Sequence, residues 1–516
     1  MTSKRILSAT LWLAGFSQVP IQAKKSLQQR LRWSLQLPNV EENGSPAKHN
    51  GIVTSTDGKS LWMTTQKGFL YGVDAADGSL IVKHQPYPWT KMTESKPVLC
   101  EKTDANGESS VEYVVYAISD GRVIAVNTSD GLERWMMYSE YCTPTQPMIS
   151  HDCSKVYYTC NKRHINESEL FVVNDEESRK NFMGMPEDQV TRQGEKLGPV
   201  SVGAQATRST GNMYLYFGSY QEDDTNTTSA VKERSSFNQV VGHTIRYNAL
   251  DRSLEELSVV EDGVQAPVGL SRDEKLLWAS TYDPNTKETT LHGMTALTGQ
   301  LRGARIANQS IWSRSLGMTS EHLNHAPIKT RDEQSLFVAT EKSVYKISAK
   351  DGTVQWNVPD LNIKAMPVLH PGLLDSNGQR RLTDAAESTT LYVMEDTGGR
   401  VWKVDTATGD MELEANCIDS ATCAMASHAD FATSPDGTML YIALNSGLVY
   451  ALETTQPFAA SSADLDEPPT AAEPSEDANA KNPSTNPESA AFSTGNFVSI
   501  TFSVVSSIAI IIFLSF

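Results

Sequence analysis

Three histidines recur at the same place in a repeated sequence, and imidazole is a side chain that can do chemistry near neutral pH. A short segment of the type APIKT, with proline second, is repeated along the chain, and two residues before that position stand His49, His325 and His428. If the copies superimpose, the three rings gather at one place, where they could bind a metal ion or make a pH-sensitive contact. The other copies place other residues there, so the alternative is that each histidine only caps the start of a strand: Ser95, Thr145, Leu197, Gln265 and Ala365.

The cysteines form the second group of reactive side chains. An even number of cysteines fits a set of disulfides in an oxidising compartment, and the chain has six: Cys100, Cys142, Cys153, Cys160, Cys417 and Cys423. Fifteen pairings are possible. Cys417 and Cys423 lie close together in one loop, and Cys153 and Cys160 bracket a predicted hairpin, so local bridges are the simplest expectation. The C-x-x-C spacing of a zinc site is absent.

Composition and missing motifs exclude several classes of function. The chain contains no Gly-rich phosphate loop, no G-x-S-x-G nucleophile elbow and no H-E-x-x-H helix. Its formal net charge is −18, and no basic run follows the first residues, so a nucleic-acid partner is not expected. With 516 residues and ordinary apolar and charged fractions, the chain is long enough for a large folded core.

Both ends of the chain have the composition of targeting segments. Lys4 and Arg5 precede an apolar run that reaches small residues near Ala23, which predicts a signal peptide over residues 1–23. Residues 497–516 carry no charge and are long enough to span a bilayer. Small residues from Ser489 and a short polar spacer precede this run, as in a GPI-attachment signal. A GPI anchor at Ser489 and a C-terminal transmembrane helix both remain open.

Two further features agree with passage through the secretory pathway. Residues 459–496 form an acidic linker rich in Pro, Ala and Ser, which cannot bury enough apolar surface to fold. Four sequons are candidates for N-glycosylation: Asn127, Asn166, Asn226 and Asn308. The sequence therefore predicts a membrane-anchored glycoprotein at the cell surface or in the lumen of an organelle.

The repeat predicts the elements that position the histidines. DGRVIAVNTSDGLERW, at residues 120–135, has counterparts that begin near residues 67, 342, 398 and 446, and the proline-containing segment or a degenerate form of it occurs eight times. Each copy offers four short strands separated by Gly, Asp, Asn and Ser turns, with a period of about 54 residues. Four strands at this period predict the blades of a propeller, with the first strand of each blade at the axis. The three histidines then lie at one mouth of the central channel.

The two ends of the repeat region predict how the ring closes. The eighth copy has three strands but no outer strand, whereas LRWSLQLP at Leu31–Pro38 resembles an outer strand that stands before the first copy. Pairing these two parts would leave no open edge in that sheet. We therefore predict an all-β fold over residues 31–458: an eight-bladed propeller of four-stranded antiparallel blades, closed by the amino-terminal strand.

Two segments, AISDGRVIAVNTSDGLERW and ATEKSVYKISAKDGTVQW, resemble the repeat of quinoprotein, or PQQ-like, propellers, which has the pattern Y-x-x-x-x-D-G-x-V-Y-A-L-D-x-x-T-G-x-x-x-W. Trp33, Trp135 and Trp356 fall at the tryptophan position of this repeat, where the resemblance implies that they bridge neighbouring blades. Catalytic relatives are similar to one another in having a vicinal Cys-Cys pair, a calcium site and an Asp base. The chain has no Cys-Cys pair, so no cofactor is expected, and pyrroloquinoline quinone with calcium is the alternative.

These observations together favour a binding function over catalysis. We expect a membrane-tethered extracellular or lumenal scaffold that binds a protein or glycan partner at a propeller face. The alternative is a quinone-dependent oxidoreductase with a diverged active site. The longest turn, Ser219–Thr244, is predicted to be an interaction loop, although it could also be an insertion without a role.

Overall fold

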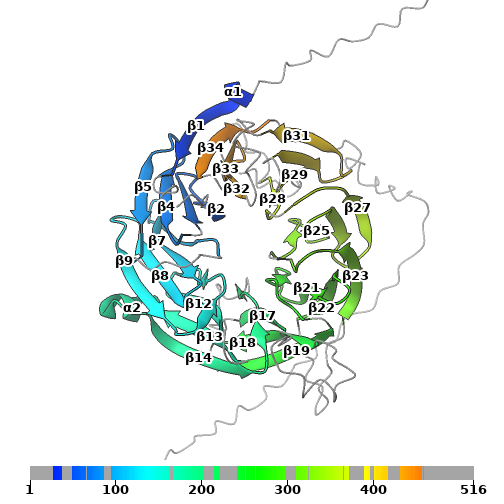
Figure 1. Cartoon of the computed structure of the whole chain (residues 1–516), viewed down its shortest axis with the longest axis horizontal. Coiled ribbons are helices and arrows are strands. Elements are labelled where there is room, and N and C mark those ends of the chain that lie inside the picture. Colours follow the sequence, from blue (N-terminus) through cyan, green and yellow to red (C-terminus); the bar gives the residue numbers. More distant parts are fainter. Residues whose placement is uncertain are drawn as a thin grey trace, which may run out of the picture. The chain divides into compact units, whose positions relative to one another are not determined.

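The strands of the chain form eight antiparallel sheets that follow one another around a ring (Figure 1). This architecture confirms the predicted eight-bladed propeller, and all the described residues belong to the first of two units, Met1–Ser461. The computed structural model describes residues 27–37, 49–65, 67–86, 95–162, 167–202, 214–220, 241–249, 252–261, 263–296, 310–323, 325–363, 365–370, 389–395, 400–416, 430–444, 447–455 and 457.

In the first four blades the strands follow one another from the axis outward (Figure 1). Blade 1 contains β2 (His49–Thr54), β3 (Ser60–Thr65), β4 (Leu70–Asp74) and β5 (Leu80–His84). Blade 2 contains β6 (Val98–Thr103), β7 (Ser109–Ile118), β8 (Arg122–Asn127) and β9 (Glu133–Tyr138). Blade 3 contains β10 (Cys142–Pro144), β11 (Met148–Ile149), β12 (Lys155–Lys162), β13 (Glu167–Asn174) and β14 (Met185–Gln193). Blade 4 contains β15 (Lys196–Leu197), β16 (Ser201–Val202), β17 (Tyr214–Tyr220), β18 (Val241–Asn248) and β19 (Ser253–Glu261).

The other four blades complete the ring. Blade 5 contains β20 (Gly269–Leu270), β21 (Leu276–Asp283), β22 (Glu288–Thr295) and β23 (Ser310–Met318). Blade 6 contains β24 (Ile328–Lys329), β25 (Ser335–Ala339), β26 (Val344–Ser348) and β27 (Val354–Val358). Blade 7 contains β28 (Val368–Leu369), β29 (Thr390–Met394), β30 (Val401–Asp405) and β31 (Met411–Ala415). Blade 8 contains β32 (Asp430–Thr433), β33 (Met439–Ala443), β34 (Leu448–Glu453) and, outermost, β1 (Leu31–Gln36).

The amino-terminal strand closes the ring, as the repeat count predicts. β1 pairs antiparallel with β34, with Leu35 opposite Val449. A short helix, α1 (Leu27–Arg30), leads directly into β1. Closure joins residues more than 400 positions apart, so the eighth blade is complete only when both ends of the propeller are in place.

Tryptophans in the outer strands of some blades join the blade to the next one. The indole nitrogen of Trp33 in blade 8 donates a hydrogen bond to the carbonyl oxygen of Ala75 in blade 1, at 2.9 Å. Trp356 of blade 6 makes the same contact with Thr406 of blade 7, at 3.1 Å. Gly78 has a φ of +77°, and a Cβ atom there would lie 2.6 Å from the Trp33 ring. The bridging role predicted for these tryptophans is confirmed, and the glycine of the D-G turn leaves room for the ring.

A repeated hydrogen-bond pattern, in which a Ser or Thr hydroxyl bonds to an Asp two residues later, shapes the hairpin that leads into the second main strand of a blade. Ser150 Oγ donates to Asp152 Oδ1 at 2.6 Å and accepts from the backbone nitrogen of Lys155 at 2.9 Å. Because the hydroxyl donates one hydrogen bond within the turn and accepts another from the residue that begins β12, it fixes where this strand starts. The same pattern occurs at Ser55, Ser271, Thr330 and Ser434.

The core lies between the blades, where the second and third strands are covered on both faces. In β3 and β8 nearly every side chain is buried. Among the described residues, no helix is long and apolar enough to cross a membrane. The predicted signal peptide, linker and C-terminal apolar segment lie outside the described residues.

Candidate functional site

Of the three histidines predicted at the channel mouth, His325 is the one whose side chain the structure describes. His325 is 7% exposed, and its Nδ1 atom lies 3.1 Å from the carbonyl oxygen of Ala326. Burial lowers the pKa of His325, and the positive charge of Lys96 lowers it further. Burial thus favours the neutral ring, which lies beside the backbone just before β24 (Ile328–Lys329). His49 begins β2, but its side chain and all of His428 lie outside the described atoms.

An ion pair occupies the axial ends of three neighbouring blades, and the sequence analysis did not identify it. Lys96 Nζ of blade 2 lies 2.9 Å from Asp430 Oδ2 of blade 8. The same oxygen accepts a hydrogen bond of 2.9 Å from the backbone nitrogen of Ile52 in blade 1. A Cβ atom at Gly51 would lie 2.1 Å from Lys96 Cγ, so glycine makes room for the lysine stem. The signal in the sequence was that positions 51 and 430 do not carry the proline of the other copies, since Asp430 forms the ion pair and Gly51 leaves room for Lys96.

The disulfides join different cysteines from those predicted. Cys100 bonds to Cys153, and Cys142 bonds to Cys160, each with a Cα–Cα distance of 5.5 Å. The expected local Cys153–Cys160 bridge is wrong, because each of these cysteines bonds to another partner. Cys160 lies in the extended strand β12 (Lys155–Lys162), which begins two residues after Cys153 and carries Cys160 out of its reach. The predicted Cys417–Cys423 pair lies outside the described residues.

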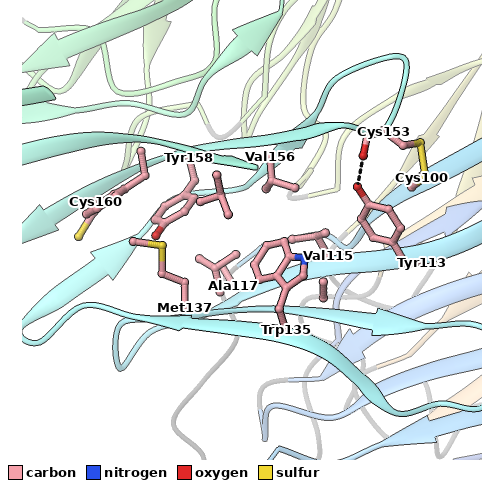
Figure 2. Close-up of a cluster of buried hydrophobic side chains, with 14 of the residues drawn as sticks. Cys100, Tyr113, Val115, Ala117, Trp135, Met137, Cys153, Val156, Tyr158 and Cys160 are labelled. Carbon is pink, nitrogen blue, oxygen red and sulfur yellow. Dashed lines mark hydrogen bonds between the residues drawn. A yellow bond between two sulfur atoms is a disulfide. The ribbon is translucent and has the colours of Figure 1, made fainter. Parts of the chain in front are cut away.

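The two disulfides lie in one buried cluster between blades 2 and 3. Figure 2 shows the cluster, with Trp135 and Val115 of blade 2 facing Val156 and Tyr158 of blade 3. Tyr113 donates a hydrogen bond of 2.7 Å to the carbonyl oxygen of Cys153, the dashed line in Figure 2. The Cys100–Cys153 bond therefore links two blades that already share a core, and the four described cysteines are all oxidised.

A short helix replaces the usual D-G turn of blade 3. Helix α2 (Asp175–Asn181) begins after Asn174, whose side chain accepts a hydrogen bond from the backbone nitrogen of Glu177. Asp175 is buried and accepts hydrogen bonds from Arg134 Nε at 2.8 Å and from the Trp135 indole at 2.8 Å. The guanidinium of Arg134 also stacks over the Tyr113 ring, 4.5 Å from its centre. Blade 2 thus fixes the start of α2.

The segment after α2 carries exposed apolar side chains on the outer rim, where Figure 1 shows α2 beside β9 and β14. Phe182, Met183 and Met185 are 76%, 65% and 42% exposed, and Tyr138 at the end of β9 is 58% exposed. We call these four residues the rim surface. Met183 pairs in parallel with Met136 of β9, so this segment covers part of the outer edge of blade 2.

The backbone beneath the rim surface is held firmly. The nitrogen of Gly184 donates to the carbonyl oxygen of Met136 at 2.9 Å, and the nitrogen of Met185 donates to the buried Ser178 Oγ at 2.7 Å. A Cβ atom at Gly184 would lie 2.3 Å from Met137 Cβ. Phe182 has a φ of 54°, in the left-handed region that an aromatic residue adopts only at a cost. This arrangement presents large apolar side chains from a fixed backbone.

The base of the long turn holds a cluster of charges that the sequence analysis missed. The structure describes Ser219 and Tyr220 at one end of the predicted loop and residues 241–244 at the other. Glu195 Oε1 lies 2.9 Å from His243 Nδ1, and Glu195 Oε2 lies 3.0 Å from Arg192 Nε. Although burial alone raises the pKa of Glu195, hydrogen bonds from His243 and Arg192 outweigh it and lower the pKa to about 2.

Among the described residues, one arrangement resembles a catalytic triad: a hydroxyl contacts an imidazole, which in turn contacts a carboxylate. His84 Nδ1 lies 2.8 Å from the Tyr116 hydroxyl, and His84 Nε2 lies 3.4 Å from Glu133 Oε1. Tyr116 is fully buried, and this burial raises its pKa well above the usual value. A phenol that is buried and held protonated cannot act as a nucleophile on an external substrate. The series instead connects blade 1 to blade 2.

Only one of the four predicted glycosylation sites lies among the described residues. Asn127 ends β8, is half-buried, and accepts a hydrogen bond through Oδ1 from Arg134 Nη1 at 3.1 Å. Its amide nitrogen is the atom that a glycan would use, so glycosylation there stays a prediction. Asn166, Asn226 and Asn308 lie outside the described residues.

Solved structures of other proteins share this propeller architecture. A comparison with the sequences of curated proteins finds no match. The crystal structure of Saccharomyces cerevisiae Sqt1 is similar over 83% of this chain and 99% of that chain, with 8% identity and a TM-score of 0.54. The Dos1 propeller is similar over 82% of this chain and 94% of that chain, with 9% identity and a TM-score of 0.52. At this identity the two structures support the fold alone.

The sequence of the chain also matches a model of a protein family. A family model described as outer membrane protein assembly factor BamB matches residues 20–180 and 268–466. The match therefore extends over more than half of the chain and falls on both sides of blade 4. The chain belongs to this BamB-like family of PQQ-like repeat propellers.

Proposed function

We propose that the protein is a membrane-tethered extracellular or lumenal scaffold that binds a protein partner through its rim. The observation that carries this proposal is the rim surface: Tyr138, Phe182, Met183 and Met185. Large apolar side chains gathered on the surface of a soluble domain mark interaction sites. Aromatic residues and methionine are also the types enriched in protein interfaces.

The support beneath the rim surface favours binding over accidental exposure. Phe182 stands at the end of α2 in a left-handed conformation for which glycine is the usual residue. The surrounding backbone is fixed by hydrogen bonds to blade 2 and to Ser178. A rigid surface loses little conformational entropy on binding, so more of the contact energy contributes to affinity.

The family and the cysteines support the assembly role and the compartment. The matching family is described as an assembly factor, which supports a function in holding other proteins. The two disulfides support an oxidising compartment, as the predicted signal peptide does. The predicted linker at residues 459–496 and the anchor at residues 497–516 would hold the propeller at a membrane.

The test is a comparison of partners between the protein and a rim variant. We expect Phe182→Ser with Met183→Ser to weaken partner capture about tenfold or more, because central apolar anchors each contribute over 1 kcal/mol. The full-length tagged protein would be purified from its own cells after mild cross-linking, and captured proteins would be quantified by mass spectrometry.

The matched control is Ile311→Ser with Met318→Ser on β23 of blade 5, where both side chains are also more than half exposed. This control should retain the partner, and neither double variant should change the melting temperature by more than a few degrees, since all four side chains face solvent. Equal capture by the rim variant and the unaltered protein would contradict the proposal.

A further inference from the structure

Glu195 lies in the link between blades 3 and 4 and is held by one charged group from each blade. It stands between β14, the outer strand of blade 3, and β15, the first strand of blade 4. Arg192 of β14 and His243 of β18 both contact its carboxylate, and its side chain is only 9% exposed. The backbone carbonyl of Glu195 also accepts a hydrogen bond of 2.7 Å from Ser168 in β13. Each of the two blades therefore contributes one charged side chain that contacts the Glu195 carboxylate.

The polar and charged groups around His243 come from β17, β19, β14 and the link between blades 3 and 4. β17 supplies Ser219, whose Oγ accepts a hydrogen bond of 3.1 Å from the backbone nitrogen of His243. β19 supplies Glu256, which bonds to Arg192 at 2.6 Å and acts on the imidazole through its charge. The link and β14 supply Glu195 and Arg192. With His243 protonated, two positive and two negative groups are balanced within this half-buried junction.

We propose that His243 is a proton-sensitive lock that ties β18 of blade 4 to Glu195 when the imidazole is charged and releases it when the imidazole is neutral. Deprotonation removes the ion pair between Glu195 and blade 4, whereas Arg192 continues to hold the carboxylate from blade 3. The loss of this ion pair should therefore increase local unfolding only where β17 and β18 lie near it, around Ser219 and His243. This inference does not depend on the rim surface or on the proposed scaffold function.

The direction of the pH dependence follows from the two partners. The hydrogen bond that His243 donates to Glu195 raises the pKa of His243, against the opposing effect of burial. A raised folded pKa means that the stabilisation is complete below about 6.5, the value of a free histidine, and is lost as pH rises through the folded value. Glu195, with its pKa near 2, remains charged throughout this range. The lock is thus closed in mildly acidic solution and opens in alkaline solution.

Two buried histidines, His292 and His325, differ from His243 in the direction of their pKa shift. Burial lowers the pKa of His292 to about 4, and its ring nitrogens lie 3.0 Å from the Thr281 hydroxyl and 2.9 Å from the Ser313 hydroxyl. Burial also lowers the pKa of His325. Burial therefore favours the neutral form of both rings, in contrast to His243.

Hydrogen exchange measured by mass spectrometry tests the lock. After correction for intrinsic exchange rates, peptides from β17 and β18 of the intact protein should exchange about threefold or more faster at about pH 8.5 than at about pH 6. His243→Gln should remove the difference between the two pH values. The control His151→Gln changes an exposed histidine and should preserve the difference. An unchanged difference in His243→Gln, or no difference in the unaltered protein, overturns the proposal.

Two further measurements keep the test decisive if His243→Gln folds poorly. Glu195→Gln removes the charged partner and should abolish the same pH difference. Direct NMR titration of the His243 ring in the unaltered protein should give a pKa above about 6.5. A value at or below 6.5 overturns the proposal without any substitution.

Discussion

Replacing Arg30 by methionine is expected to lower the free energy of unfolding by about 3–5 kcal/mol, because it leaves a buried carboxylate without its cation. Arg30 Nη2 lies 2.5 Å from Glu414 Oε1, and Arg30 Nη1 lies 2.6 Å from the Glu414 carbonyl oxygen. The side chains of Arg30 and Glu414 are 7% and 0% exposed.

The position of this pair explains why its loss should affect the whole ring. Arg30 immediately precedes β1, Glu414 lies in β31 of blade 7, and Thr455 follows β34. The backbone nitrogen of Thr455 donates to Glu414 Oε1 at 2.8 Å. Both ends of the propeller thus meet at one carboxylate beside the closing blade.

Urea unfolding followed by tryptophan fluorescence measures the effect. The control is Arg32→Met, because Arg32 pairs with Glu453 near the surface, where its side chain is 59% exposed. An exposed pair contributes at most about 1 kcal/mol. If Arg30→Met costs no more than Arg32→Met, the buried pair does not hold the ring closed.

Replacing Trp135 by alanine is the second substitution with a large expected effect, about 3–5 kcal/mol of unfolding free energy. The side chain is 1% exposed, and it fills the centre of the cluster between blades 2 and 3 (Figure 2). Its indole nitrogen also donates to Asp175 at the start of α2. The change therefore creates a cavity and removes a hydrogen bond.

The same urea titration measures this cost, and Leu132→Ala is the control. Leu132 lies three residues away and is 64% exposed, so its loss should cost less than about 0.5 kcal/mol. Hydrogen exchange in α2 should also become faster in Trp135→Ala, because Asp175 loses one of its anchors. A cost near that of Leu132→Ala would show that Trp135 does not bridge the blades.

The sequence was sufficient to predict the fold because the information is local and repeated. Each D-G turn and each Ser/Thr-x-Asp turn fixes a hairpin within a few residues, and eight copies of the pattern specify eight blades. Ring closure was predictable for the same reason, since LRWSLQLP resembles an outer strand in a place that has no other strand. The tryptophan bridges followed from the same motif.

The functional features were harder to predict because they depend on contacts between blades. The Cys100–Cys153 bond and the Lys96–Asp430 pair join residues whose neighbours are set by ring geometry and not by spacing in the chain. The rim surface arises where α2 replaces a turn, and the signal in the sequence was Phe182 and Met183 within an otherwise polar connection. The fold of the blades does not itself determine what they bind.

We propose that this propeller is a binding scaffold and not a quinone-dependent enzyme. The most direct test is a titration of the purified protein with pyrroloquinoline quinone and Ca²⁺, followed by tryptophan fluorescence, together with dye reduction in the presence of a panel of alcohols. The scaffold account predicts no saturable change at about micromolar quinone and no dye reduction. Saturable binding with turnover would contradict it and would show that the chain is an oxidoreductase.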